Sequence, residues 1–84
     1  MALVLGLREG KKFRVGQHQF GIHRIKSETG FILSHEGIYY DIDDVAAKVV
    51  AKGVSIKCGK RGQRHLARVC IEADRALRIT RVED

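Results

Sequence analysis

Arginines recur between apolar residues in the last part of the chain, at Arg68, Arg75, Arg78 and Arg81. A guanidinium group binds anions well because its planar fork pairs with a carboxylate or a phosphate through parallel hydrogen bonds. In a strand, alternation of this kind buries one face and exposes the other. Residues 68–84 therefore predict two short strands, joined by a turn at 73–76, that offer a row of cations to an anionic ligand.

A basic loop precedes these two strands. Residues 57–68 contain six basic residues, counting His65, and no acidic one. The segment 59–64 within them contains glycine and predicts a loop. Two interpretations of it remain open, a cradle for phosphate groups or an ordinary exposed turn.

The composition places these cations in a small basic protein. The chain has 84 residues, with 16 Lys and Arg against 10 Asp and Glu and a formal net charge of +6. This length predicts one domain, residues 1–84, whose thin core favours oligomerisation. The positive charge favours a nucleic-acid partner, since basic side chains neutralise phosphates. With two cysteines and no secretory or membrane-spanning segment apparent, we expect a cytoplasmic protein that binds no membrane.

Catalytic motifs do not stand out in the sequence. Ser27, Ser34 and Ser55 lie in no nucleophile motif, and neither a phosphate-binding glycine loop nor a pair of carboxylates is evident. We therefore expect a protein that is not an enzyme.

Metal-ligating residue types are present but scattered. Four residues could supply zinc ligands in principle: His35, Cys58, His65 and Cys70. Their spacing fits no paired-ligand motif, so no metal or cofactor is expected. His18 and His23 are interpreted as surface or partly packed residues.

Short strands are the elements that would position the cations. Alternating or apolar runs bounded by turn residues predict strands at 3–7, 12–16, 19–25, 31–35, 38–42 and 54–58. The first two are expected to pair as a hairpin, and so are 31–35 and 38–42. A final hairpin is expected from the alternation of Ala67, Val69, Ile71, Leu77 and Ile79.

One segment has a different period. Val45, Val49 and Val50 recur at helical spacing after Asp43, which has the chemistry of an N-cap, and Gly53 supplies a stop. This pattern predicts a helix at 43–52. The fold class expected is therefore mainly β, a small antiparallel sheet domain with one short inserted helix.

The two ends of the chain carry a further pattern. Residues 3–10 read Leu-Val-Leu-Gly-Leu-Arg-Glu-Gly, and residues 67–81 read Ala-Arg-Val-Cys-Ile-Glu-Ala-Asp-Arg-Ala-Leu-Arg-Ile-Thr-Arg. These runs resemble the first strand and the last two strands of the carbon storage regulator (CsrA/RsmA) family of bacterial RNA-binding translational regulators. A helix before the last three strands resembles the family's helix-inserted, RsmN-like branch. Residues 54–58 then match the central strand, and 17–53 form an insertion with a β-hairpin and the helix.

A second alignment lays the family's five strands and helix over residues 3–52. In that register Ile42 takes the place of the arginine that ends the family's last strand. The first alignment is preferred because it matches the alternation, the turn and Arg81 together.

The resemblance implies an interleaved homodimer that binds RNA. In the family, single-stranded or hairpin-loop RNA with a GGA motif lies along an edge made by the first strand of one chain and the last strand of the other. The residues expected to bind RNA here, with the basic loop included, are Leu3, Val4, Leu5, Arg8, Lys60, Arg61, Arg64, Arg75, Leu77, Ile79 and Arg81. Arg81 is the strongest candidate. Three positions depart from the family pattern: Leu7 replaces an arginine, Cys70 a glycine and Asp74 a proline.

The sequence therefore predicts a post-transcriptional regulator that recognises GGA motifs in mRNA leaders or small RNAs and blocks ribosome access. No DNA partner is expected. The alternative is a fold of this kind used as a protein-interaction module, of a mobile-element or phage type, that binds a host protein.

Overall fold

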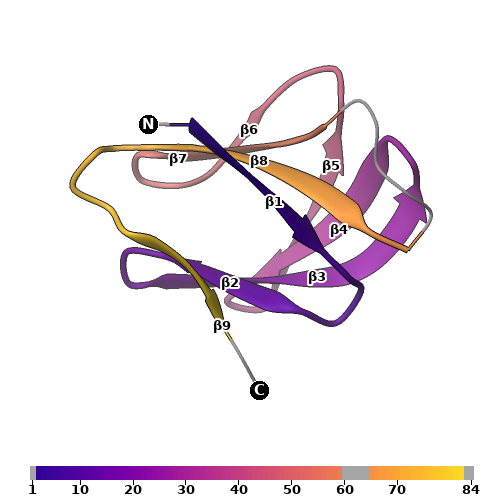
Figure 1. The fold of residues 1–84 in the computed structure, drawn as a ribbon, viewed down its shortest axis with the longest axis horizontal. Coiled ribbons are helices and arrows are strands. Elements are labelled where there is room, and N and C mark those ends of the chain that lie inside the picture. The colour runs from indigo at the N-terminus through magenta and orange to yellow at the C-terminus, as the bar shows by residue number, and fades with distance from the viewer. Residues whose placement is uncertain (1, 60–64, 83–84) are drawn as a thin grey trace.

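Two antiparallel sheets contain all nine strands of the described residues, 2–59 and 65–82, in this computed structural model (Figure 1). Sheet A has the strand order β1 (Ala2–Leu7), β8 (Ala67–Ala73), β7 (Val54–Cys58) and β6 (Lys48–Ala51). Sheet B has the order β5 (Ile38–Asp43), β4 (Gly30–His35), β3 (His18–Ser27), β2 (Lys12–Val15) and β9 (Ile79–Val82). The mainly β, antiparallel fold that the sequence predicts is confirmed.

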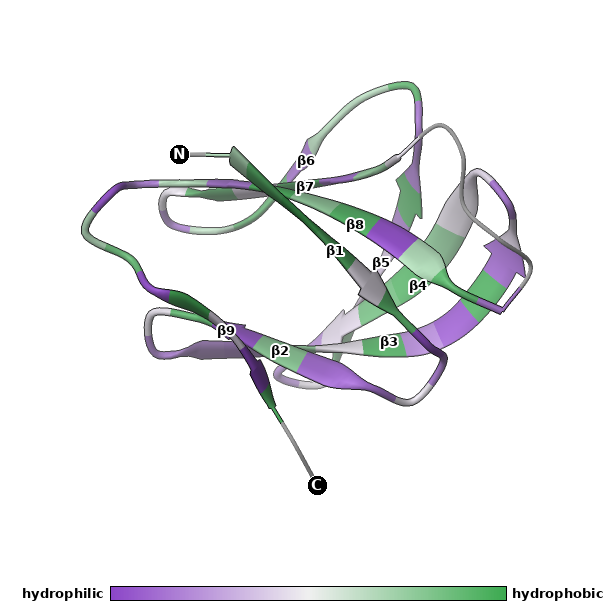
Figure 2. Cartoon of the chain, in the orientation of Figure 1, coloured by the Kyte–Doolittle hydropathy of each residue, from purple (hydrophilic) through white to green (hydrophobic). Residues whose placement is uncertain are grey.

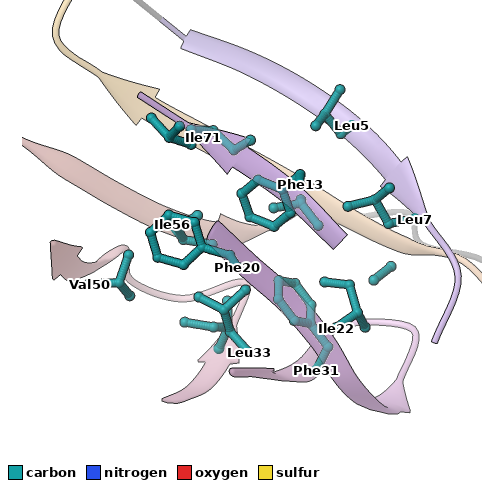
Figure 3. Close-up of a cluster of buried hydrophobic side chains, with 14 of the residues drawn as sticks. Leu5, Leu7, Phe13, Phe20, Ile22, Phe31, Leu33, Val50, Ile56 and Ile71 are labelled. Atoms are coloured by element: carbon teal, nitrogen blue, oxygen red, sulfur yellow. The ribbon is translucent and has the colours of Figure 1, made fainter. Parts of the chain in front are cut away.

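The core lies between the two sheets. Strands in both sheets alternate buried apolar residues with exposed ones, which is visible as changing colour along the ribbons in Figure 2. The residues that meet in the centre include three phenylalanines of sheet B and the branched side chains of sheet A (Figure 3). The largest fully buried side chains are Phe13, Val15, Phe20, Ile22, Phe31, Leu33, Ile42, Val54, Ile56, Val69 and Ile71. Burial of this apolar surface is the main force that holds the sheets together.

The helix expected at 43–52 is wrong. Strand β5 continues to Asp43, and after a short loop Lys48–Ala51 forms β6, which pairs with β7. Within β6, Val50 is buried whereas the adjacent Val49 is 73% exposed, and the pairing with β7 shifts register between Val49 and Ala51. An isolated helix of about ten residues is marginal, and β-branched valines favour a sheet once a partner strand is available.

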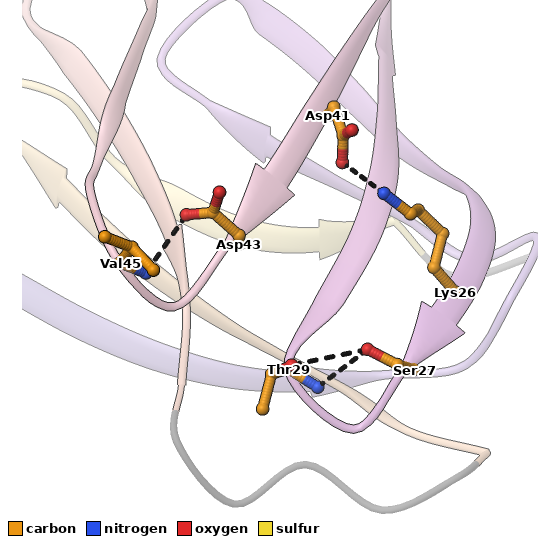
Figure 4. Close-up of polar contacts among 6 residues, drawn as sticks. All are labelled: Lys26, Ser27, Thr29, Asp41, Asp43 and Val45. Carbon is orange, nitrogen blue, oxygen red and sulfur yellow. Dashed lines mark hydrogen bonds and ion pairs between the residues drawn. The ribbon is translucent and has the colours of Figure 1, made fainter.

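Asp43 has the role of a cap without a helix. Its carboxylate accepts hydrogen bonds from the backbone N–H groups of Val45 at 3.0 Å and Ala46 at 3.3 Å, as Figure 4 shows for Val45. These two bonds, reinforced by Lys48 and Lys26, lower the pKa of Asp43 below its ordinary value. The same local bonding that starts a helix therefore closes a turn here.

Two expected hairpins are also wrong: the hairpin of β1 with β2 and the hairpin of β8 with β9. β1 pairs with β8 in sheet A, whereas β2 lies between β3 and β9 in sheet B. The turn expected after β8 does form, since Leu77 N–H donates to the carbonyl of Asp74 at 3.0 Å, but it leads from one sheet to the other. A turn determines the local direction of the chain but not which strand the next segment pairs with. That pairing depends on which apolar side chains become buried in the core. The hairpin of β4 and β5 is confirmed.

Membrane-spanning helices are not found in the part of the chain that the structure describes.

Candidate nucleic-acid interface

A pocket of about 480 Å³ lies where β1 ends, β2 begins and β9 passes. Its lining combines apolar residues from sheet A with basic residues from the turn after β1 and from sheet B. The described residues that line it are Gly6, Leu7, Arg8, Lys11, Lys12, Leu66, Arg81 and Val82. Four of these side chains are basic and none is acidic, so the pocket is suited to an anionic ligand.

Arg81 reaches this pocket because of its register in sheet B. It lies opposite Phe13 in the β2–β9 ladder, and cross-strand neighbours project from the same face of a sheet. Phe13 is completely buried between the sheets. The exposed Arg81 therefore projects from the inner face of sheet B at its outermost strand, toward the gap between the two sheets. No hydrogen bond or ion pair holds its guanidinium among the described residues.

Arg8 reaches the same pocket from the other sheet. It follows Leu7, the buried last residue of β1, and its carbonyl accepts a 3.0 Å hydrogen bond from the N–H of Lys11. The turn is anchored to β3 because Gly10 N–H donates to the carbonyl of Ile22 at 2.7 Å. The end of β1 is thus held firmly beside the start of β2.

Glu9, the acidic residue of this turn, is engaged elsewhere. Its carboxylate accepts a 2.8 Å hydrogen bond from the backbone N–H of Ile25 on β3. It is not part of the pocket lining. The pocket therefore keeps its positive character although a carboxylate lies next to Arg8 in the sequence.

Gly6 shapes the apolar part of the lining. A Cβ at this position would lie 2.9 Å from Cδ2 of Leu66, closer than such atoms approach. Because the side chain is absent, Leu66 can lie against β1 and form part of the pocket. A larger residue at position 6 would displace Leu66.

Two sheet edges meet at this pocket. β1 is the outer strand of sheet A, and β9 is the outer strand of sheet B. Each has one edge that pairs with no strand of the described residues, and such edges present N–H and C=O groups to a ligand. The first strand expected beside Arg81 was that of a partner chain. The structure instead brings the end of this chain's own β1 to the pocket, so both sides of the site come from one molecule.

The other residues expected at the interface lie in different settings. On β1, Val4 is 51% exposed, Leu3 is partly buried and Leu5 is buried. Leu77 and Ile79 pack against the core, and Arg75 is exposed in the turn before β9, outside the pocket lining. The expected contacts at Lys60, Arg61 and Arg64 lie outside the described residues.

Lys11 and Lys12 are pocket residues that the sequence analysis missed. The sequence does contain an indication of a basic site here, because Arg8, Lys11 and Lys12 occur within five positions around a turn. Only the crossing of the chain from sheet A to sheet B at this turn brings them beside Arg81.

An exposed aromatic pair lies on sheet B near a second, shallower pocket. The rings of His23 and Tyr39 have centroids 4.7 Å apart, and Tyr39 is 61% exposed. Tyr39 and Lys12 both line this second pocket, which has a volume of about 310 Å³. Lys12 therefore lines both this pocket and the pocket at Arg81.

The two cysteines point to opposite faces of sheet A. Cys58 lies opposite the buried Val69, whereas Cys70 lies opposite Lys57 and is partly exposed. Burial, with smaller contributions from Asp44, Cys70 and Asp43, raises the pKa of the Cys58 thiol to about 11. Metal binding requires the thiolate, so Cys58 is a poor ligand. Among the described residues, neither cysteine belongs to a converging group of three or more metal-ligating side chains.

Comparison with known proteins gives no assignment. No protein-family model matches the chain, and neither a curated protein nor a solved structure shows significant similarity to it. The relation to the carbon storage regulators therefore remains a resemblance carried by the two ends of the sequence.

Proposed function

We propose that this protein binds single-stranded RNA in the pocket between the end of β1 and β9. The observation that carries the proposal is the convergence of Arg8, Lys12 and Arg81 at the meeting point of two sheet edges, with no carboxylate in the described lining. Basic side chains supply attraction to the phosphates, while edge amides and carbonyls hydrogen-bond to unstacked bases.

The pocket has a suitable size for one extruded nucleotide. Its volume of about 480 Å³ falls in the range of roughly 300–1,000 Å³ found for pockets that hold small ligands. Leu7 and Leu66 offer an apolar surface for a base, and Arg81 can pair with a guanine edge through two hydrogen bonds. This combination supports recognition of a base rather than of phosphate alone.

A path for neighbouring nucleotides leads over Lys12 to Tyr39. Lys12 lines both pockets, and the exposed Tyr39 ring provides a surface on which a base stacks. Stacking on an aromatic side chain contributes about 1–3 kcal/mol per base. Tyr39 is thus the second contact in the proposal, without sequence preference of its own.

The sequence resemblance supplies the identity of the target. GGA motifs in mRNA leaders or small regulatory RNAs are the proposed ligands, and occlusion of the ribosome-binding site is the proposed effect, in the cytoplasm. Because one chain supplies both sides of the pocket, recognition does not depend on a dimer. A homodimer, if formed, adds the ability to bridge two GGA sites.

Titration of a hairpin RNA with GGA in its loop, against a matched CCA hairpin, tests the proposal. We expect tighter binding of the GGA hairpin, measured by gel shift at fixed salt. Equal affinity for both would reduce the proposal to non-specific RNA binding, and absence of binding to both would refute it.

A protein-interaction module is the second candidate. Val45 and Val49, next to and within the outer strand β6, are 81% and 73% exposed, and exposed apolar side chains at a sheet edge favour addition of a partner's strand. Replacing both valines with lysine separates the two functions. Loss of a protein partner with RNA binding intact would assign this edge to protein contacts.

A further inference from the structure

Three side chains with metal-binding atoms converge at one end of sheet B. They are His18 at the start of β3, His35 at the end of β4 and Glu36 in the turn that follows. Their ligand atoms all lie within 4.8 Å of one another. In the part of the chain that the structure describes, no other group of three or more such residues converges in this way.

The orientation of His35 is fixed by a backbone carbonyl. Its Nδ1 lies 2.9 Å from the carbonyl oxygen of Gln19, which only accepts a hydrogen bond. Nδ1 therefore carries the hydrogen, and the lone pair of the neutral ring is on Nε2. Nε2 lies 4.0 Å from the Glu36 carboxylate, on the side of the other candidate ligands. This is the usual arrangement of a metal-binding histidine, whose second nitrogen is held by a carbonyl or a carboxylate.

Aromatic packing holds the same ring in place. The His35 ring stacks on Phe20 with centroids 4.4 Å apart and an angle of 29° between the planes. His18 meets His35 edge-on at 5.5 Å. His35 is only 7% exposed, while His18 is half-buried and Glu36 is exposed. The site thus combines one rigid, buried ligand with two that remain accessible to an ion from solvent.

Glu36 adopts an unusual backbone conformation. Its φ is +50°, and it is the only residue other than glycine with positive φ among those described. Gly37 follows with φ +78°, which gives a two-residue turn that asparagine followed by glycine would fill with less strain. A glutamate at this position places a carboxylate next to His35 at the expense of local strain, as residues at binding sites often do.

We propose that His18, His35 and Glu36 bind a divalent transition-metal ion of the Zn²⁺ class. Two imidazoles and one carboxylate are typical ligands of Zn²⁺, and a set of three leaves one position open to water or another ligand. Tetrahedral ligands at about 2.0–2.2 Å from the ion lie roughly 3.3–3.6 Å apart. The ligand atoms lie within 4.8 Å of one another, so binding requires the half-buried His18 and the exposed Glu36 to move closer, by roughly 1 Å, while the buried His35 stays in place.

None of the three residues lines the pocket at Arg81, but His35 and Glu36 line the second pocket together with Lys12 and Tyr39. The metal site therefore borders the proposed RNA path at that second pocket. It would join the β2–β3 turn to the β4–β5 turn. Binding to the folded state alone raises the melting temperature, so the ion would act on stability without any RNA present.

Calorimetric titration of the full chain with Zn²⁺ alone tests the proposal, in a Cys70→Ser background that removes the accessible thiol. We expect one ion per chain, a Zn²⁺-dependent rise in melting temperature, and at least tenfold weaker binding in the His18→Gln variant. His23→Gln is the matched control, since His23 lies outside the cluster, and should bind as tightly as its parent.

Glu36→Asn separates loss of a ligand from loss of the fold. Asparagine is more favourable than glutamate at positive φ, so this variant should melt at the same or a higher temperature than its parent without metal. Its Zn²⁺ affinity should nevertheless fall at least tenfold. Absence of a one-to-one complex in the parent, or unchanged affinity in both His18→Gln and Glu36→Asn, would overturn the proposal.

Discussion

Arg81 on β9 lies opposite Phe13 on β2, so a guanidinium group and a completely buried aromatic ring project from the same face of sheet B. The strand is the last of its sheet, and the pocket at its edge is lined by Arg81 together with Arg8 and Leu66 from the other side. An inward-pointing charge on an edge strand also discourages pairing with another molecule. The position of Arg81 therefore disfavours pairing of this edge with a strand of another molecule.

The salt dependence of RNA binding reports how many cations take part. With Arg8, Lys12 and Arg81 in the pocket, we expect log affinity to fall against log salt with a slope of roughly −2 for single-stranded RNA. Arg8→Ala and Lys12→Ala should each reduce the magnitude of the slope by about 0.7. Fluorescence anisotropy at several salt concentrations measures this slope. A slope that neither substitution changes would exclude Arg8 and Lys12 from phosphate contact.

Val49 and Val50 distinguish the observed strand from the helix expected at 43–52. Val50 is buried and Val49 is 73% exposed, so Val50→Ala should lower the free energy of unfolding by about 1–3 kcal/mol. Val49→Ala should change it by no more than about 0.5 kcal/mol. Urea denaturation of the two variants provides the comparison. Equal losses would contradict the burial of Val50 and the exposure of Val49 in β6.

Residues 43–53 also show what a local pattern leaves open. Asp43 and Gly53 do have the local properties expected of a cap and a stop, since Asp43 accepts backbone hydrogen bonds and Gly53 has φ +74°. Both features suit a loop or a hairpin turn equally well. The choice of strand over helix depends on pairing with Val54–Cys58, which lies beyond the segment itself.

The pairing of distant strands limits the prediction of the site in the same way. Alternation predicts most strands within a few residues. Arg8 and Arg81, which the sequence places together only across two chains, line one pocket of a single chain. The pairing of β1 with β8 and of β2 with β9 depends on burial across the core, which no local run of residues encodes. Lys12 was not predicted for this reason. Nor was the cluster of His18, His35 and Glu36, whose side chains meet only once both turns of sheet B are formed.

Asp43 gives the stability of the fold a dependence on acid pH. Its pKa is lowered in the folded chain by the N–H groups of Val45 and Ala46, so the ionised form is favoured by folding. This contribution is present above the unfolded value of 3.8 and is lost as the pH falls through the lower folded pKa. Asp43→Asn keeps an acceptor but removes the titration. Urea denaturation should show a smaller loss of stability on acidification for this variant than for the parent, and identical profiles would contradict the assignment.

The thiols should differ in reactivity. Burial raises the pKa of Cys58 to about 11, so its reactive thiolate is scarce at neutral pH, whereas Cys70 is partly exposed. Mass spectrometry after brief iodoacetamide treatment should find Cys70 modified first. Because folding favours the protonated Cys58, its contribution to stability is present below about pH 9 and is lost as the pH rises toward 11. Faster labelling of Cys58 than of Cys70 in the folded protein would contradict this account.

The affinity of Arg81→Ala for a GGA hairpin, measured beside Arg78→Ala, tests the central claim most directly. Both substitutions remove one arginine from an exposed position, but only Arg81 lines the pocket. We expect Arg81→Ala to weaken binding by about 1–3 kcal/mol, roughly 5- to 150-fold, if it contacts a base, and to reduce the preference for GGA over CCA. Arg78→Ala should change affinity only slightly and keep the preference. Equal effects of the two substitutions, or none from either, would contradict an RNA site between β1 and β9.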